Sequence, residues 1–349
     1  IQHAINQGAR VMVTSHLGRP KEGEYSEENS LRPIAEYLGR LLQYPVRLQK
    51  NWVDEEFSVN PNELVVLENC RFNVGESKNL EALAKKYASL TDIFIMDAFG
   101  AAHRKQASTY GVAEFSSIAC AGILFSNELE ALENVMTSAK NPMIAIVGGS
   151  KVSTKLSLLD SLSDKVDQLI LGGGIANTFL KAQGCEIGQS LYEPNFIPQA
   201  KKIIYKLQAR GASLPILKDV VCGKQFDPNE PAVVKQIDQI MPDDMIFDLG
   251  PKSMKVIVAI VKGAKTILWN GPLGVFEYSQ FSQGTELLAK SIAKSNGFSL
   301  AGGGDTISAI QMFGVEKDIS YISTAGGAFL EFVEGKKLPA IEILQARAS

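Results

Sequence analysis

The amino-acid sequence predicts an α/β protein with two doubly wound parallel-sheet domains, joined by a helix and separated by a cleft. Three observations indicate this fold. The chain has 349 residues, and a single hydrophobic core rarely extends beyond about 250–300 residues. Short aliphatic runs alternate with helical patterns along the whole chain, as in repeated strand–helix–strand units. Most of these runs are apolar on both faces, which is typical of strands covered by helices on both sides.

Ten short segments are predicted as strands of Rossmann-like sheets, because each is aliphatic and ends at a glycine or a polar cluster. They are residues 11–14, 64–67, 92–96, 143–147, 168–171, 215–221, 245–248, 266–269, 298–301 and 321–323. Helical patterns are visible at residues 1–7, 80–90 and 285–295. In residues 80–90 the apolar stripe consists of Leu80, Leu83, Ala84 and Tyr87, spaced as one face of a helix.

A connecting helix is predicted near the middle of the chain. Ser126 can cap a helix whose fourth following residue is Glu130, and the pattern stops at Asn141-Pro142. We therefore expect an N-terminal domain at residues 1–127, a connecting helix or hinge at 128–141, and a C-terminal domain at 142–337.

The composition excludes several classes of protein. Hydrophobic residues make up 45% and charged residues 21% of the chain, as in ordinary globular proteins. No apolar run approaches the roughly 18 residues of a membrane helix, and no secretory signal opens the chain, so we expect a cytoplasmic protein without a membrane partner. The net charge of −3 disfavours a nucleic-acid partner. Four widely spaced cysteines, Cys70, Cys120, Cys185 and Cys222, are expected to be free thiols.

The residues that follow the strands differ between the two halves. In the first half they are SHLGRP (15–20), ENCRF (68–72) and FGAAHRK (99–105), which carry His16, Arg19, Arg71, His103 and Arg104. In the second half they are the glycine-rich segments 148–151, 172–174, 270–274, 302–306 and 325–327. Open parallel sheets bind ligands at the carboxyl ends of their strands. One domain therefore offers cationic side chains there, and the other offers bare backbone.

Glycine-rich strand ends expose N–H groups that can bind phosphate oxygens. A single glycine run is often only a tight turn, but five runs at one edge of a sheet favour a nucleotide site. The sequence contains no GxxxxGK[ST] motif and no GxGxxG motif after the first strand of either half. The first absence excludes a P-loop enzyme, and the second weighs against a dinucleotide dehydrogenase.

Individual charged residues support anion binding, although each also has a purely structural interpretation. Lys151 and Lys155 have helical spacing and would project from one face near a helix start; they bind an anion or are a solvated surface pair. Asp305, next to Thr306, either caps a helix or binds Mg²⁺ together with phosphate oxygens. The histidines and arginines of the first half either pack locally or bind a phosphorylated acid. Two anion sites facing each other across the connector suggest phosphoryl transfer.

Eight segments, in order, resemble the motifs of the phosphoglycerate kinase family in its bacterial form, over essentially the whole chain. They are SHLGRP (15–20), LENCRF (67–72), MDAFGAAHR (96–104), VGGSKVSTK (147–155), LGGGIANTFL (171–180), LWNGPLGVFE (268–277), AGGGDT (301–306) and YISTAGGAFLE (321–331). The resemblance implies reversible transfer of a phosphoryl group from 1,3-bisphosphoglycerate to MgADP, giving 3-phosphoglycerate and MgATP in glycolysis. It also implies hinge-bending domain closure, a monomer, and a C-terminal segment 338–349 that packs back on the first domain.

The resemblance assigns roles to particular residues. His16, Arg19, Arg71 and Arg104 would bind the phosphoglycerate. Four residues would be catalytic and would act on the phosphoryl group during its transfer: Lys151, Lys155, Gly326 and Gly327. The nucleotide would contact Gly149, Ser150, Lys151, Lys155, Gly173, Gly174, Asn270, Pro272, Glu277, Gly303, Gly304, Asp305 and Thr306. Asp305 would bind the Mg²⁺ that the nucleotide carries, and Glu277 would bind the ribose.

The sequence departs from the family pattern in three places. Family members carry about forty more residues before the position of Ile1, so we expect an N-terminal segment to be missing from this sequence. Ala325 replaces a customary glycine and Ala101 a common threonine. Two other functions remain as alternatives: a non-catalytic two-domain protein that captures an anionic metabolite, and a nucleotide-dependent oxidoreductase, which the missing dinucleotide motif disfavours.

Overall fold

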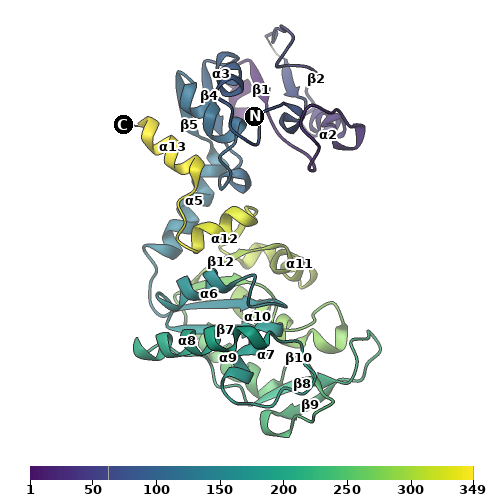
Figure 1. Ribbon diagram of the computed structural model, residues 1–349, viewed down its shortest axis with the longest axis vertical. Coiled ribbons are helices and arrows are strands. Elements are labelled where there is room, and N and C mark those ends of the chain that lie inside the picture. The colour runs from purple at the N-terminus through teal and green to yellow at the C-terminus, as the bar shows by residue number, and fades with distance from the viewer. Residues whose placement is uncertain (62, 349) are drawn as a thin grey trace. The chain divides into compact units, whose positions relative to one another are not determined.

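The computed structural model describes residues 1–61 and 63–348 and confirms the α/β class, with parallel sheets and helices alternating along the chain (Figure 1). Contacts divide the chain into two compact units, Ile1–Phe125 together with Leu338–Ser349, and Ser126–Lys337. Ser349, the last residue of the predicted returning segment, lies outside the described residues. None of the helices in the described residues has both the length and the apolar composition needed to cross a membrane.

The strands of the first unit form two small parallel sheets. One consists of β1 (Val11–Val13), β2 (Val46–Gln49) and β3 (Leu64–Leu67) in the order β1-β3-β2, and the other of β4 (Ile93–Met96) and β5 (Ile118–Ala121). The predicted strands 11–14, 64–67 and 92–96 correspond to β1, β3 and β4. The sequence analysis did not identify β2 or β5.

Among the described residues, five α-helices lie wholly in the first unit: α1 (Gln2–Asn6), α2 (Arg32–Leu42), α3 (Glu81–Ser89), α4 (Val112–Phe115) and α13 (Pro339–Ala348). The predicted stripe on α3 is buried at Leu83, Ala84 and Tyr87, which pack with Trp52 and Val65. Leu80, predicted to belong to this stripe, is instead 46% exposed, because it precedes the helix as its N-cap.

Helix α13 packs on the first unit although it ends the sequence. The Ala340 N–H donates to the carbonyl oxygen of Ala102 at 3.1 Å, and Nη2 of Arg347 donates to the carbonyl oxygen of Ser116 at 2.7 Å. Ala340, Ile341 and Ile343 are buried. The chain therefore returns to the first unit after it has formed the second.

The second unit contains one five-stranded parallel sheet. Its strands are β6 (Met143–Gly148), β7 (Gln168–Gly172), β11 (Thr266–Asn270), β12 (Phe298–Gly302) and β13 (Tyr321–Ser323), in the order β13-β12-β11-β6-β7. Because β7 lies on one side of β6 and the later strands lie on the other, the strand order reverses between β6 and β11. In open α/β sheets this switch point is where ligands bind.

Helices cover both faces of this sheet (Figure 1). One core contains side chains of α9 (Pro251–Gly263), α10 (Gln283–Ala293) and α11 (Gly304–Met312), packed against β-strand residues such as Ile144, Ile267 and Trp269. The other helices are α6 (Leu156–Ser163), α7 (Gly173–Ala182), α8 (Ile197–Ala209) and α12 (Gly327–Val333), which contact one another in series. The unit is thus doubly wound, as predicted.

The predicted strands 215–221 and 245–248 do not join the parallel sheet. They correspond to β8 (Asp219–Gly223) and β10 (Met245–Leu249), which form an antiparallel sheet with β9 (Val233–Gln236) in the order β10-β8-β9. The expectation of a parallel arrangement was wrong here because no α-helix lies between β8 and β10 in the described residues, and parallel neighbours need a long crossover connection, usually an α-helix.

Helix α5 (Ile123–Met136) crosses the division between the two units, which falls between Phe125 and Ser126. The predicted cap at Ser126 is wrong, because the helix begins at Ile123 and Ser126 lies inside it. The helix also ends at Met136, before the predicted limit at residue 141.

Candidate active site

Four basic side chains, three arginines and one histidine, converge at the strand ends of the first unit. His16 and Arg19 follow β1, Arg71 follows β3, and Arg104 follows β4. The four side chains are close enough to change one another's pKa. The charges of Arg71 and Arg104 both lower the pKa of His16, and those of Arg104 and Arg19 both lower the pKa of Arg71. In residues 1–61 and 63–348 none of the four forms an ion pair with a carboxylate within 4 Å. The cluster therefore carries uncompensated positive charge.

The positive charge changes the state of His16. Partial desolvation, followed by the positive charges of Arg71 and Arg104, lowers its pKa to about 4 although part of the ring is exposed. His16 is therefore neutral at pH 7 and can donate one hydrogen bond without adding charge. Burial and Arg104 also lower the pKa of Arg71, and its Nη2 is buried without a hydrogen-bond partner in the described structure.

A polar framework holds the loop that carries His16 and Arg19. The amide nitrogen of Asn69 donates to the carbonyl oxygens of Leu17 and Asn29, at 2.8 Å each, and its amide oxygen accepts from the Arg71 N–H at 3.0 Å. The buried carboxylate of Glu68 accepts from the Ser30 hydroxyl at 2.7 Å and from the Leu31 N–H at 2.8 Å. The loop is thus fixed from β3 before any ligand binds.

In the second unit, Lys155 lies at the switch point of the sheet. Its Nζ donates to the carbonyl oxygen of Gly148 at 2.5 Å and to that of Asn270 at 3.2 Å, which are the last residues of β6 and β11. Burial lowers its pKa to about 8, and the Asp305 carboxylate opposes this shift. The ends of β6 and β11 are therefore joined by one lysine, with Asp305 of α11 nearby.

Glycines permit close backbone contacts at this edge. A Cβ on Gly148 would lie 1.8 Å, and one on Gly172 2.3 Å, from the carbonyl oxygen of Pro272. A Cβ on Gly174 would lie 2.2 Å from the carbonyl oxygen of Ser150. Gly173 has a φ of +63°, which only glycine adopts freely. The segments 148–150, 172–174 and 271–273 thus form one continuous backbone surface.

Asn270 and Thr306 support this surface from inside. The Asn270 amide nitrogen donates to the carbonyl oxygen of Gly302 at 2.7 Å, and its amide oxygen is buried without a partner. The Thr306 hydroxyl accepts from the Gly271 N–H at 2.7 Å and donates to the carbonyl oxygen of Gly302 at 2.9 Å. Both side chains are therefore occupied in holding the ends of β11 and β12 together.

Asp305 is not the N-cap of its helix, contrary to the structural interpretation offered for it. Gly303, with a φ of +100°, is the N-cap of α11, and Asp305 lies exposed in its first turn. The position leaves its carboxylate available on the same side as Lys155. Gly304 and Glu277 are also exposed, as are Gly326 and Gly327 at the start of α12.

Lys151 and Lys155 do not share a helix face as predicted. Helix α6 begins only at Leu156, with Lys155 as its N-cap, and residues 151–154 form turns ahead of it. The Lys155 side chain turns back to the strand ends, whereas Lys151 is exposed. The predicted pair is therefore one half-buried lysine and one exposed lysine.

Three residues that position the glycine segments were missed by the sequence analysis. The buried Glu128 on α5 accepts from the N–H of Thr324 at 3.0 Å and from its hydroxyl at 3.2 Å. The Thr285 hydroxyl accepts from the N–H groups of Leu273 and Gly274, at 3.1 Å and 3.3 Å. Asp248 contacts the same segment. In the sequence, these three residues are marked only as polar residues within an otherwise apolar helix or strand.

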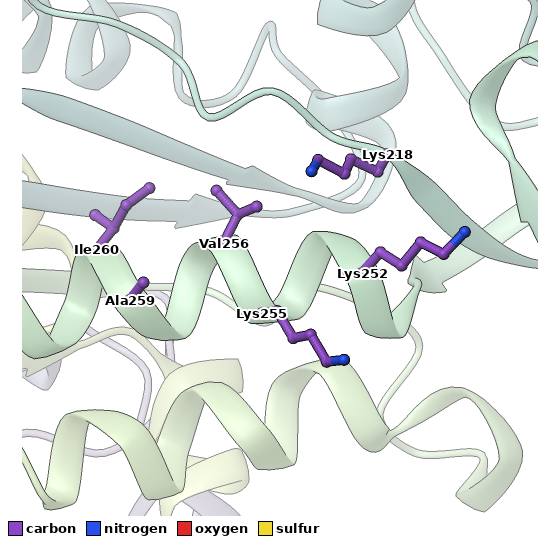
Figure 2. Close-up of a pocket in the computed structure, with 6 residues that line it drawn as sticks. All are labelled: Lys218, Lys252, Lys255, Val256, Ala259 and Ile260. Carbon is purple, nitrogen blue, oxygen red and sulfur yellow. The ribbon is translucent and has the colours of Figure 1, made fainter.

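A shallow depression of about 640 Å³ lies away from these residues in the fold (Figure 2). It is lined by Lys218, Lys252, Lys255, Val256, Ala259 and Ile260. All belong to α9 or to the segment before β8, and none to a glycine segment. The glycine edge of the sheet, with its exposed backbone and Lys155, remains the candidate site.

One unit carries a cationic cluster, and the other carries a glycine-rich switch point in a doubly wound sheet. These features are typical of a phosphotransferase. The sequence profile described as phosphoglycerate kinase matches residues 1–336. The chain therefore belongs to the phosphoglycerate kinase family, an enzyme family that transfers a phosphoryl group in glycolysis and uses a nucleotide and other small molecules as substrates.

Individual relatives agree with this assignment. The chain is 55% identical over 348 residues to the phosphoglycerate kinase of Francisella tularensis subsp. holarctica, covering all of this chain and 88% of the relative. The structure of phosphoglycerate kinase from Coxiella burnetii matches all of this chain and 89% of its own, with 50% identity and a TM-score of 0.96. That from Pyrococcus horikoshii matches 99% of this chain with 28% identity and a TM-score of 0.82.

Proposed function

We propose that the chain catalyses reversible phosphoryl transfer between 1,3-bisphosphoglycerate and MgADP, giving 3-phosphoglycerate and MgATP, with the acid on residues 1–127 and the nucleotide on residues 142–337. The observation that carries this division is the contrast between three arginines and a neutral histidine at the strand ends of one unit and a bare-backbone switch point on the other. A small phosphorylated acid suits the first, and a nucleotide suits the second.

The phosphorylated acid would bind to His16, Arg19, Arg71 and Arg104. Arginine forks suit phosphate and carboxylate oxygens, and the buried, unpartnered Nη2 of Arg71 is a donor that a ligand oxygen could satisfy. Neutral His16 would donate a hydrogen bond to the same group. A ligand carrying roughly −1.5 to −2 charges per phosphate would neutralise the cluster.

The nucleotide would lie along the continuous backbone surface. Its base and ribose would contact Gly149, Gly173, Gly174, Pro272 and Glu277, the last through its exposed carboxylate. Its phosphates would meet Ser150, Lys155 and the start of α11 at Gly303 and Gly304, where N–H groups and the helix dipole favour anions. Asn270 and Thr306 would act from beneath by keeping Gly271 and Gly302 in place.

Lys151, Gly326 and Gly327 would act on the phosphoryl group during transfer. The acceptor in the direction of ATP use is a carboxylate that is already ionised at pH 7, so no general base is needed. The main obstacle is repulsion between two anionic substrates, and cations and N–H donors reduce it. Lys151 has an exposed ammonium group on a turn, which can reach a bound phosphoryl group without breaking an internal hydrogen bond.

Asp305 would hold Mg²⁺ through the nucleotide. The residues fit this ion, because Mg²⁺ takes one or two carboxylates together with phosphate oxygens, and Asp305 supplies one exposed carboxylate near Lys155. Within residues 1–61 and 63–348 no group of three or more histidine, cysteine or acidic residues could bind a metal without the nucleotide. When bound, Mg²⁺ neutralises phosphate charge during transfer.

We further propose that the protein acts as a cytoplasmic monomer and that its domains close around both substrates. The test of the function is a coupled assay on the full-length protein with 3-phosphoglycerate and ATP, with and without Mg²⁺. Product that depends on all three components is expected. Binding of phosphoglycerate without any turnover would instead indicate a metabolite-capturing protein.

A further inference from the structure

Asp248 is a buried carboxyl group that the proposed mechanism does not use. It lies on β10 and is 1% exposed. The pairing of β10 with β8 shifts register between Ile246 and Asp248, and such bulges redirect side chains near functional sites. Oδ2 of Asp248 accepts from the Gly284 N–H at 2.7 Å, whereas Oδ1 is buried without a partner in the described structure.

The Asp248 carboxyl group fills the space between two glycines from different segments. A Cβ on Gly274 would lie 2.4 Å from its Oδ1, and a Cβ on Gly284 would lie 2.2 Å from the same atom. Gly284 is in the first turn of α10, and Gly274 is in the segment after β11. The absence of both side chains is what allows the carboxyl group to contact both segments.

These contacts belong to a clamp on residues 273–275. The Thr285 hydroxyl accepts from the Leu273 and Gly274 N–H groups, and the Val275 N–H donates to the carbonyl oxygen of Phe247 at 2.8 Å. Thr285 follows Gly284 directly, and Phe247 precedes Asp248. Asp248 therefore joins the two elements, α10 and β10, that hold this segment.

The clamped segment continues into the candidate nucleotide site. The Leu273 carbonyl oxygen accepts from the Gly173 N–H at 3.0 Å, and Pro272 lies against Gly148 and Gly172. A movement of residues 273–275 would therefore displace Pro272 and Gly173 together. Misplacement of binding groups by about 1 Å can reduce function about 100-fold.

We propose that Asp248 is a positioning residue for the nucleotide: by capping the first turn of α10 and filling the gap between Gly274 and Gly284, it fixes the segment on which the base and ribose of ADP rest. This inference rests on the proposed function. Asp248 does not touch the substrate itself. The neutral, protonated form of Asp248 is favoured at this position, because burying an ionised carboxylate whose Oδ1 has no hydrogen-bond partner is unfavourable.

Asp219 provides a matched control in the same sheet. Its carboxylate, like that of Asp248, is buried, caps a helix through the Lys252 and Ser253 N–H groups at 3.1 Å and 2.8 Å, and lies against a glycine, Gly250. The helix it caps is α9, which carries none of the nucleotide residues. A substitution there removes the same kind of interaction without changing the clamp.

The test compares KM for ADP, KM for the phosphorylated acid and kcat in three variants of the full-length protein. Asp248→Ala is expected to raise KM for ADP about tenfold or more, with kcat and KM for the acid within about threefold. Asp248→Asn keeps the acceptor for Gly284 and the volume, so it should restore KM for ADP to within about threefold. Asp219→Ala should lower the unfolding temperature without changing KM for ADP.

Equal effects of Asp248→Ala and Asp219→Ala on KM for ADP would overturn the proposal, as would an Asn variant as impaired as the Ala variant. If Asp248→Ala does not fold, Gly274→Ala, whose methyl group would press on Oδ1 from the other side, must raise KM for ADP selectively. Direct titration of wild-type protein with ADP separates the two claims. Wild-type protein that binds no ADP contradicts the proposed function, whereas binding unaffected by either substitution contradicts only the role of Asp248.

Discussion

His16 shows how the cationic cluster changes a single residue. Because its pKa is lowered to about 4 by burial and by Arg71 and Arg104, its imidazole should titrate near pH 4 and remain neutral through the physiological range. Arg104→Ala removes one cause of the shift, so the midpoint should rise, but not to the ordinary value, since burial is the larger cause. An NMR pH titration of the His16 ring measures both. A midpoint near 6.5 in the wild-type protein would contradict both the desolvation of His16 and its proximity to Arg71 and Arg104.

Lys151 is the residue on which the proposed transfer step depends most. Lys151→Ala should lower kcat by roughly 10²–10⁵, the range for removing a group that stabilises charge in the transition state, while the dissociation constant for ADP changes little. Lys255→Ala removes the same charge from an exposed lysine of the depression on α9 and should leave kcat unchanged. A tenfold loss or less in Lys151→Ala would remove Lys151 from the central role.

Asp248 should make folding stability depend on pH. Burial raises its pKa from 3.8 to about 7, and hydrogen bonds from the Gly284 and Leu249 N–H groups oppose this shift. From about pH 4 to 7 the unfolded state has lost the proton that the folded state keeps. The free energy of unfolding therefore falls by up to about 1.4 kcal/mol per pH unit as pH rises, and levels off above pH 7.

Asp248→Asn removes this titration, so its stability relative to the wild type should increase between pH 4 and 7 and then stay constant. Urea unfolding at pH 5, 6, 7 and 8 measures the difference. The ionisable groups of β8, α7 and α10, the elements packed against β10, have other partners. Asp219 caps α9, Lys181 pairs with Glu186, Glu286 pairs with Lys290, and Cys222 interacts with Asp244 and Lys235. A pH-independent difference would mean that Asp248 is ionised at neutral pH.

The location of residues that follow strands could be predicted from the sequence, because the carboxyl ends of parallel strands lie at the same edge of a sheet. Lys151 and Lys155 show the limit of that reasoning. Their spacing suggested a shared helix face, but the carbonyl oxygen of Asn270, 115 residues away, decides where Lys155 points. Asp248 and Glu128 were missed for the same reason, since their partners Gly284 and Thr324 are 36 and 196 residues away.

At the scale of elements, aliphatic strands were predicted even where they are partly exposed, as in β1 and β4, whereas strands with polar or small residues were not. The strand β3 is fully buried and β6 is apolar throughout, so both are recognisable. The missed strands β2, β5 and β9 are half exposed or exposed, and contain polar or small residues. Their place in the sheets depends on neighbouring strands rather than on their own composition.

The contact between α5 and the segment after β13 gives a prediction at this scale. Glu128→Ala removes both hydrogen bonds to Thr324 and frees the residues that lead to Gly326 and Gly327. Loss of hydrogen bonds to a charged group costs about 1.5–3 kcal/mol, so kcat should fall roughly 10- to 100-fold if this order is needed in the transition state. Steady-state kinetics measure the effect. Glu130→Ala, an exposed residue on the same helix, is the control, and equal kcat values would show that the contact serves stability alone.

For the whole molecule, the proposed location of the two substrates on separate units predicts a movement of the units. Transfer requires the two substrates to meet, and water must be kept away from the phosphoryl group to prevent hydrolysis. Each substrate alone neutralises the charge of one unit only, so closure should be favourable only when both are bound. One helix and one returning segment connect the units, and we expect such connections to permit this movement.

Small-angle X-ray scattering tests this on full-length protein with 3-phosphoglycerate and MgADP, a pair that binds without reacting. The radius of gyration should decrease with both ligands present and remain near the ligand-free value with either one alone. Arg71→Ala, which removes a cation from the acid site, should abolish the decrease even when MgADP is saturating. Compaction with MgADP alone would assign closure to the nucleotide, and an unchanged radius with both ligands would contradict a mechanism in which closure excludes water.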